Sequence, residues 1–419
     1  METSLNPPAR APEKRAWAVA QMGARMHYAV PRVLHSAGLL DRLYTDIVGS
    51  DRLAHWIRLL PRMAQAKPLK RLMARVPVGI PEERIECSPL FGLEAFARFA
   101  LARRYPRLLE WAILESGRGF CEELLPRTLE GLKGLYVFNL AGLELLKRAV
   151  DEGLVGVVEQ TIAPYRIEVQ LLRNEHSAWP SWETPTECGG RTDEIAERER
   201  DEWALAKIIV CGSEFVREGV ISSGGPAGRC CVVPYGVDSA VGSRRLRRAD
   251  HQRAVNVLFA GTLCLRKGIQ YLYDAAKRLP RGRFRVRAVG ACRLTKAAQK
   301  EVAKYIDVTP HVPRSAMAEL FAWADVFVLP SICEGSATVI YEALSAGLPV
   351  ITTRNSGSIV RHGIDGFVVP LRNSEKIVEH LELLLSQPKI QEELSENARA
   401  RSMSFTVAEY GDRLLATIL

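Results

Sequence analysis

Two glutamates, Glu334 and Glu342, stand in one segment of the chain with seven residues between them. The apolar run 324–330 before them is typical of a buried parallel strand. The residues after Gly335 predict a helix that ends near Gly347. Glu334 is therefore expected in a loop at the carboxyl end of a strand, which is where open α/β sheets bind their ligands.

The residues around this helix start have the chemistry of a ligand site. The backbone amides of Gly335, Ser336 and Ala337 are placed to face an anion or a sugar hydroxyl. Glu342 is spaced to meet a second part of the same elongated ligand, so the segment suits a nucleotide sugar. The alternative is that Glu334 only stabilises a helix N-terminus as an acid, with Glu342 a solvated helix residue.

A second group of residues has the same organisation in the same half of the chain. Residues 257–268 predict a strand, a turn that includes Gly261 and Thr262, and the start of a helix. Arg266 and Lys267 lie where a phosphate can meet both cationic side chains and helix amides. A solvated pair of basic residues on a surface loop is the alternative. With the two glutamates, this group would supply cations for a diphosphate and acids for hydroxyls.

The second half of the chain resembles the glycosyltransferases group 1 family, also called family 4, which has the GT-B fold. The resemblance extends over roughly residues 205–405 and includes Ser213-Glu-Phe-Val216 and Pro234-Tyr-Gly-Val-Asp238. Four stretches carry most of it: 259–268, 324–331, 334–350 and 355–370. The pair of glutamates followed by Ala-Gly-Leu-Pro-Val is its most specific motif.

The resemblance implies an α/β protein with two Rossmann-like, doubly wound domains that face each other across a cleft. The expected divisions are a disordered tail, an N-terminal acceptor-binding domain, a C-terminal nucleotide-sugar-binding domain, and a final helix that crosses back to the N-terminal domain. Their bounds are 1–14, 15–238, 239–405 and 406–419.

The resemblance also implies residue roles. Glu334 and Lys267 would be catalytic, with Glu334 facing the donor sugar and Lys267 the diphosphate. Glu342 would hold the ribose hydroxyls. The remaining donor-binding residues would be Arg266, Gly261, Thr262, Gly335, Ser336, Ala337 and Thr338. Such enzymes move a hexose-type sugar from a nucleotide-diphosphate sugar to an acceptor hydroxyl with retention of configuration, and they need no bound metal or other cofactor.

Two departures from the family pattern leave other functions open. The family usually has an arginine directly after the glycine of the first loop, where this chain has Thr262. It also often has a histidine near the position of Asn139, which offers only a neutral hydrogen bond. The alternatives are a nucleotide-sugar epimerase of the same fold and a non-catalytic partner subunit of another glycosyltransferase.

The first half of the chain gives weaker indications of an acceptor site. A strand from Arg15 to Gln21 is followed by a turn that contains Gly23, Arg25 and His27. These three residues, with Asn139, are candidates for contact with the acceptor. A capped helix with one surface histidine is equally compatible with the turn. Helix-surface ion pairs are expected among Arg191, Glu194, Glu197, Arg198 and Glu202.

Charge and cysteine usage restrict the partners and the compartment. The net charge of +9 favours anionic partners such as nucleotides, phosphorylated lipids or membrane surfaces. The nine cysteines include no C-x-x-C pair, which argues against a zinc site or a disulfide framework. A cytoplasmic protein is therefore expected. The acceptor would be a glycan or a lipid-linked molecule in polysaccharide, glycolipid or cell-envelope glycan synthesis.

Residues 51–76 combine basic and apolar side chains against a single acid, Asp51. A basic amphipathic segment of this kind can lie on an anionic membrane, here at the inner face of the cell membrane. A charged, solvated helix that covers the core is the alternative. Nucleic-acid binding is not expected, because no recognised motif accompanies the basic residues.

Overall fold

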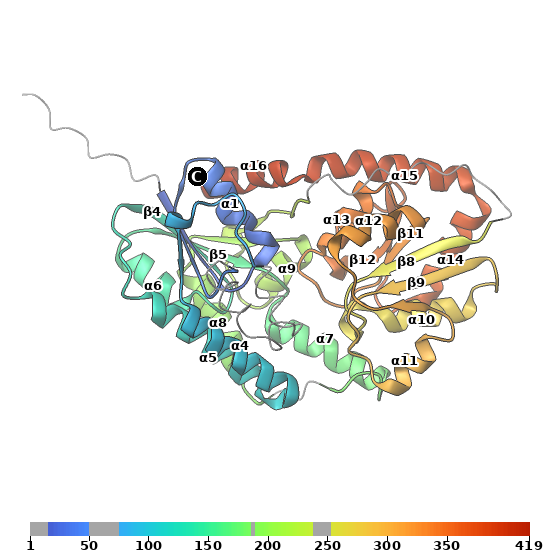
Figure 1. Cartoon of the computed structure of the whole chain (residues 1–419), viewed down its shortest axis with the longest axis horizontal. Coiled ribbons are helices and arrows are strands. Elements are labelled where there is room, and N and C mark those ends of the chain that lie inside the picture. Colours follow the sequence, from blue (N-terminus) through green and yellow to red (C-terminus); the bar gives the residue numbers. More distant parts are fainter. Residues whose placement is uncertain (1–15, 50–74, 186–188, 238–252) are drawn as a thin grey trace, which may run out of the picture. The chain divides into compact units, whose positions relative to one another are not determined.

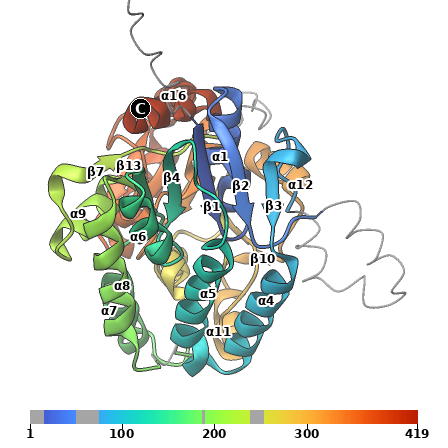
Figure 2. The same cartoon turned by 90° about the vertical axis from the view of Figure 1, so that its left-hand side faces the viewer.

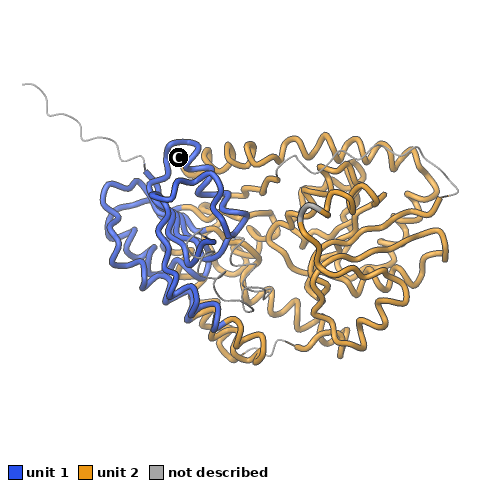
Figure 3. Tube along the Cα trace, in the orientation of Figure 1, with its two compact units in different colours: residues 1–98, 115–158, 205–207 blue, residues 99–114, 159–204, 208–419 orange. Residues whose placement is uncertain are grey.

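The computed structural model describes residues 16–49, 75–185, 189–237 and 253–419. These form two compact units, one with residues 1–98, 115–158 and 205–207 and the other with residues 99–114, 159–204 and 208–419 (Figure 3). The tail 1–14 and nearly all of the basic segment 51–76 lie outside the described residues. Within the described ranges, none of the helices combines the length and apolar character that crossing a membrane requires.

A seven-stranded sheet has the strand order β3-β2-β1-β4-β5-β6-β7. Its strands are β1 (Ala16–Gln21), β2 (Leu40–Thr45), β3 (Ile85–Cys87), β4 (Leu132–Phe138), β5 (Val155–Gln160), β6 (Ile208–Cys211) and β7 (Cys230–Val232). β1 pairs in parallel with β2 and with β4, and Figure 2 shows β1, β2 and β3 side by side. Trp17, Ala18 and Val19 of β1 are completely buried, as expected for a central strand.

Helices connect these strands in the βα order that the sequence predicts for a Rossmann-like sheet. They are α1 (Ala29–Ser36), α4 (Pro89–Arg104), α5 (Leu109–Leu124), α6 (Leu143–Asp151), α7 (Tyr165–Ala178), α8 (Thr192–Leu205) and α9 (Glu214–Ser222). Ser213 caps α9, since its hydroxyl accepts a hydrogen bond from the Val216 amide at 3.4 Å. Serine is among the residues preferred at this position, because its side-chain oxygen satisfies an amide at the start of the helix.

The second sheet has six strands in the order β10-β9-β8-β11-β12-β13, and every neighbouring pair is parallel. The strands are β8 (Val255–Ala260), β9 (Phe284–Val289), β10 (Asp307–Thr309), β11 (Val326–Leu329), β12 (Val350–Thr353) and β13 (Gly366–Val369). The predicted doubly wound class is confirmed. The strand order reverses between β8 and β11, and such a switch point is where doubly wound sheets place their ligands.

The helices of the second sheet are α10 (Ile269–Arg278), α11 (Lys296–Val302), α12 (Arg314–Trp323), α13 (Thr338–Ser345), α14 (Ser374–Ser386), α15 (Pro388–Ser402) and α16 (Val407–Ile418). α10 and α14 lie on one face of the sheet, and α12 and α13 on the other (Figure 1). α16 contacts the segment after β7, because Arg413 Nη2 donates to the Pro234 carbonyl at 3.2 Å.

The turn after β1 has an unusual backbone. Met26, His27 and Tyr28 have φ values of 45°, 51° and 61°, which is the left-handed region, although none is glycine. Each such residue costs about 1–2 kcal/mol relative to ordinary backbone. The turn is held from one side by Asp46, whose Oδ1 accepts from the Gly23 amide at 2.9 Å. Backbone strain of this kind persists where surrounding contacts determine the conformation, often at a functional site.

Replacing Met26 by glycine should therefore stabilise the protein. We expect the free energy of unfolding to rise by about 0.5–1 kcal/mol, because glycine removes the left-handed penalty but costs more chain entropy. The control is Met403→Gly, at a residue with a helical φ of −63°, which should lose about 1 kcal/mol. Urea unfolding measures both. Equal destabilisation by the two substitutions would show that the turn is unstrained.

Candidate functional site

Glu334 lies in the loop between β11 and α13, as the sequence predicted. The loop is fixed to the one that follows β12. The Glu334 amide donates to the Asn355 carbonyl at 2.9 Å, and the Ala337 amide donates to the Ser356 carbonyl at 3.1 Å. Glu334 is only 9% exposed, so its carboxylate needs a partner within the protein.

That partner is the pair of cations from the loop after β8. Arg266 Nη1 donates to Glu334 Oε1 at 2.7 Å, and Lys267 Nζ lies 2.8 Å from the same oxygen. Arg266 Nη1 also donates to the Cys333 carbonyl at 3.0 Å. The structure thus brings together three residues that the sequence proposed from two separate motifs. The resulting cluster joins the carboxyl ends of β8 and β11 at the switch point of the sheet.

The two loops approach each other at a glycine. Gly268 has a φ of +76°, and a Cβ atom there would lie 1.9 Å from the Pro330 carbonyl oxygen. The Ile332 amide donates to the Arg266 carbonyl at 2.8 Å, which adds a backbone hydrogen bond between the loops. Gly261 and Thr262 begin the same loop and are half-buried. Only glycine satisfies both the left-handed conformation and the close contact at position 268.

The remaining donor-site candidates lie at the start of α13. The Ala337 amide is engaged by Ser356, which leaves the amides of Gly335 and Ser336 for a ligand; neither donates to an acceptor within the described residues. The Ser336 hydroxyl is 2.6 Å from the Tyr341 hydroxyl. Thr338 is the exposed first residue of α13, and Glu342 is half-buried one turn further along the helix. Their contact with a ligand stays a prediction.

A segment after β5 completes the surroundings of Glu334, and no sequence motif predicted its place there. A Cβ atom at Gly335 would lie 1.8 Å from the Thr161 carbonyl oxygen, so the two backbones touch. Ser213 also donates from its hydroxyl to the Gly335 carbonyl at 2.6 Å. Glu168 of α7 lies with its Oε1 atom 3.9 Å from Arg266 Nε. No motif marks Glu168, because one acid on an amphipathic helix is typical of a solvated face.

Burial and charge shift the proton affinities in this cluster. Burial alone would lower the pKa of Arg266, but the carboxylates of Glu334 and Glu168 raise it above its ordinary value. Burial raises the pKa of Glu168; the Arg266 guanidinium opposes this shift, while the Glu334 carboxylate adds to it. Arg266 is therefore a permanent cation, and burial makes Glu168 easier to protonate than an ordinary glutamate.

The acceptor-side candidates lie around the strained turn after β1. The Arg25 guanidinium is 5.5 Å from the centre of the Phe138 ring, a cation–π distance. Asn139 follows directly after that ring at the end of β4 and is buried, whereas Arg25 and His27 are exposed. Gly23 is held by Asp46 in the same turn. Arg25 and the end of β4 are thus brought together, and an acceptor contact stays a prediction.

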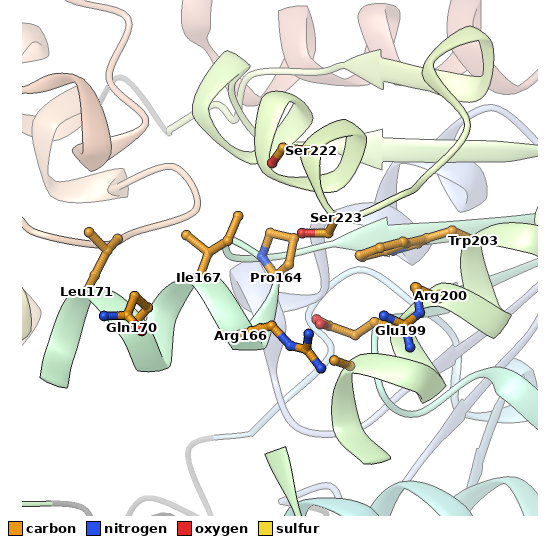
Figure 4. Close-up of a pocket in the computed structure, with 11 residues that line it drawn as sticks. Pro164, Arg166, Ile167, Gln170, Leu171, Glu199, Arg200, Trp203, Ser222 and Ser223 are labelled. Atoms are coloured by element: carbon orange, nitrogen blue, oxygen red, sulfur yellow. The ribbon is translucent and has the colours of Figure 1, made fainter. Parts of the chain in front are cut away.

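A buried hydrogen-bond network holds the segment after β5. The Trp203 indole donates to Gln160 Oε1 at 3.0 Å, and Gln160 Nε2 donates to Glu199 Oε1 at 2.8 Å. Glu199 Oε2 accepts from the Tyr165 amide at 2.9 Å. Trp203 and Glu199 also line a cavity of about 540 Å³ with Pro164, and none of the predicted donor or acceptor residues lines it (Figure 4).

The ion pairs predicted on α8 are only partly at the surface. Arg191 Nε pairs with Glu194 Oε2 at 2.7 Å, and both side chains are about one-third exposed. Arg198 and Glu202 are 4% and 0% exposed, so the prediction of a surface position is wrong for them. They lie on the helical face that carries the buried Ile195, which the run of charges in the sequence conceals.

Residues 248–401 match the model of the family described as glycosyl transferases group 1. This part of the chain is similar to members of that family. The group 1 domain includes Glu334, Glu342, Arg266 and Lys267, and the resemblance inferred from the sequence is confirmed.

Curated relatives match the chain over part of their length. A D-inositol 3-phosphate glycosyltransferase of Pseudarthrobacter chlorophenolicus is 30% identical over 218 residues, which are 48% of this chain and 52% of the relative. The amylovoran biosynthesis glycosyltransferase AmsK of Erwinia amylovora is 26% identical over 200 residues, 44% of this chain and 49% of the relative. The chain spans about half the length of the curated relatives it matches.

Solved structures share the whole fold. Anabaena HepE in complex with UDP-glucose has a TM-score of 0.61 at 14% identity, with 96% of this chain and 98% of that chain covered. Sucrose-phosphate synthase from Thermosynechococcus elongatus has a TM-score of 0.64 at 15% identity, with the same coverage. At such identities the likeness concerns the fold alone, and it confirms the predicted GT-B fold around the group 1 domain.

The close approach of the two loops can be tested at Gly268. Gly268→Ala should cost about 2–5 kcal/mol of unfolding free energy, because it adds a left-handed alanine and a collision with Pro330. The control is Gly282→Ala, which has a similar φ of +79° and open space around it, and should cost only about 1 kcal/mol. Denaturant titration compares them. Equal losses would show that the loops are not in contact.

Stability should also depend on the proton of Glu199. Burial raises the pKa of the Glu199 carboxyl from its ordinary value of 4.5 to about 8. Between these values the folded chain keeps a proton that the unfolded chain releases, so stability should fall as the pH rises through this window. Glu199→Gln should flatten that slope, measured by denaturant unfolding at pH 5 to 8.5. Glu197→Gln, at an exposed position of the same helix, should leave the slope unchanged.

Proposed function

We propose that the chain is a retaining glycosyltransferase. It would transfer a hexose-type sugar from a nucleotide-diphosphate sugar to an acceptor hydroxyl. The observation that carries this proposal is the Glu334 carboxylate held by Arg266 and Lys267 within a group 1 domain. Cations beside a carboxylate at the switch point of a doubly wound sheet suit a ligand that joins a diphosphate to a sugar.

Each group in the cluster has a role in this reaction. Lys267 and Arg266 would bind the diphosphate and stabilise the negative charge that develops when it leaves. The amides of Gly335 and Ser336 and the Glu334 carboxylate would face the sugar, and Glu342 the ribose. The acceptor oxygen would bond to the anomeric carbon as the bond from that carbon to the diphosphate breaks. The hydroxyl proton would pass to the leaving phosphate.

Relatives and neighbours support the choice of substrates. HepE binds UDP-glucose, which favours a nucleoside diphosphate hexose as the donor. AmsK and the lipopolysaccharide outer core galactosyltransferase WaaB carry names from polysaccharide and glycolipid synthesis, which favours a glycan or lipid-linked acceptor. The reaction would need no metal, because cationic side chains already meet the diphosphate. We place the enzyme in the cytoplasm, with residues 51–76 in peripheral contact with the inner face of the membrane.

The role of Glu334 can be tested once a donor is identified by thermal shift with a panel of nucleotide sugars, since a bound donor raises the melting temperature. Glu334→Gln keeps the size of the side chain and removes its charge. We expect transfer to fall by about 100-fold or more while the fold is retained. Product formation is measured by chromatography, and proton NMR of the product gives the anomeric configuration.

The matched control is Glu382→Gln, at an exposed position of α14, which should transfer at the wild-type rate. Near wild-type transfer by Glu334→Gln would refute the assigned role of this carboxylate. A product of inverted configuration would refute retention.

A further inference from the structure

Glu168 is a second carboxylate beside Arg266, and it comes from a different part of the chain than Glu334. It lies on α7, and its side chain is 19% exposed, less than the 28% of Arg266. The two carboxylates contact different atoms of the guanidinium. Glu334 accepts from Nη1 at 2.7 Å, whereas Glu168 faces Nε at 3.9 Å. One arginine side chain is therefore held from two sides.

The charges of the four residues in direct contact balance. Arg266 and Lys267 supply two positive charges, and Glu334 and Glu168 supply two negative charges. Arg293, after β9, also acts on Glu168 and opposes the rise of its pKa. A diphosphate that takes Arg266 and Lys267 as partners competes with Glu334, because that carboxylate already contacts both of them. Glu168 occupies only the Nε side of Arg266 and can stay in place.

We propose that Glu168 is a positioning residue of the donor site. It anchors Arg266 from the α7 side, so that the guanidinium can exchange Glu334 for a diphosphate without losing its place. Released in this way, the Glu334 carboxylate is able to turn to the sugar. The proposal rests on the proposed function, since it assigns Glu168 a part in the same donor site.

The segment that carries Glu168 is held firmly enough for such a role. Further along α7, the fully buried Glu175 accepts from Gln270 Nε2 at 2.8 Å and from the Tyr271 hydroxyl at 2.7 Å. Its other oxygen accepts from Arg372 Nε at 2.6 Å. Glu175 thus ties α7 to α10, the helix that begins at Ile269, two residues after Lys267. These contacts therefore hold the helix that carries Glu168 against the segment that carries Arg266.

The test uses Glu168→Gln in the full chain, with UDP, GDP and ADP each titrated by calorimetry. Glutamine keeps the shape and removes the charge, so the site becomes more positive. We expect the affinity for the diphosphate that binds wild type to rise by about three- to tenfold. With the matching nucleotide sugar, kcat should fall by about tenfold, because Arg266 then lacks its anchor on α7 and holds the diphosphate in a less productive position.

This split between tighter binding and slower turnover distinguishes positioning from packing. An isosteric glutamine would leave both quantities unchanged if Glu168 only filled space, and that result would overturn the proposal. Weaker diphosphate binding by the variant would also overturn it. The control Asp193→Asn removes a carboxylate of the exposed pair with Arg166 and should change neither quantity.

A pH series adds an independent readout. Protonation of Glu168 removes the same charge as the substitution, so wild-type affinity for the nucleotide sugar should rise as the pH falls through the raised pKa. The groups that interact electrostatically with Glu168 are Arg266, Glu334, Arg293, Glu199 and the Cys333 thiol. The variant should lack this rise. If wild type binds none of the three diphosphates at any pH, the proposed function fails, which is a different result from equal binding by wild type and variant.

Discussion

The loops at the carboxyl ends of β8 and β11 are arranged around one carboxylate, Glu334, which two cations neutralise. Glu334 is nearly buried, and a buried carboxylate without a partner would cost several kcal/mol. Arg266 and Lys267 supply that partner from a loop 68 residues away in the chain. The contact requires the loops after β8 and β11 to touch, which is why position 268 must be glycine. Thr353, at the end of β12, adds a further contact to the loop after β11, since its hydroxyl donates to the Ser331 carbonyl at 2.5 Å.

The same requirement explains why α7 belongs with the second sheet, although it follows β5 of the first sheet in the chain. Arg266 has two carboxylate neighbours, Glu334 and Glu168, and the second of them comes from α7. Glu175 is completely buried and is satisfied only because Gln270, Tyr271 and Arg372 meet it. Removing one partner would leave a buried charge uncompensated, so these contacts specify where α7 lies more than they add stability.

Local sequence patterns predicted the features that depend on neighbouring residues, namely strands, helix starts and the loops between them. The strand predicted at the start of residues 257–268 and the apolar run 324–330 both form buried parallel strands, because a buried parallel strand needs a continuous apolar run that turn residues end. The Ser213 cap and the position of Glu334 follow from the same rules. That Glu334 shares one site with Arg266 and Lys267 was inferred because both motifs end strands of one sheet, whereas their direct contact is seen only in the structure.

Long-range burial of charge could not be predicted in this way. Glu168, Glu175, Arg198 and Glu202 all lie on helices where acids and bases alternate, and this pattern is also that of a solvated face. Whether such a residue is buried depends on which distant element covers it. The left-handed residues 26–28 were equally hidden, because nothing in Met-His-Tyr favours a positive φ. Tertiary contacts, and no local preference, determine both features.

The balance of charge in the cluster links the two ends of a donor molecule under the proposed function. A carboxylate and a cation about 4 Å apart attract by roughly 4 kcal/mol at an effective dielectric constant of about 20, and by less where solvent screens them. A diphosphate competes well with Glu334 for Arg266 and Lys267, because it carries more charge and more acceptor oxygens. Once displaced, the Glu334 carboxylate needs new donors inside a buried loop, and sugar hydroxyls are donors of that kind. The diphosphate therefore prepares the group that binds the sugar, and neither part of the ligand would be held as well alone.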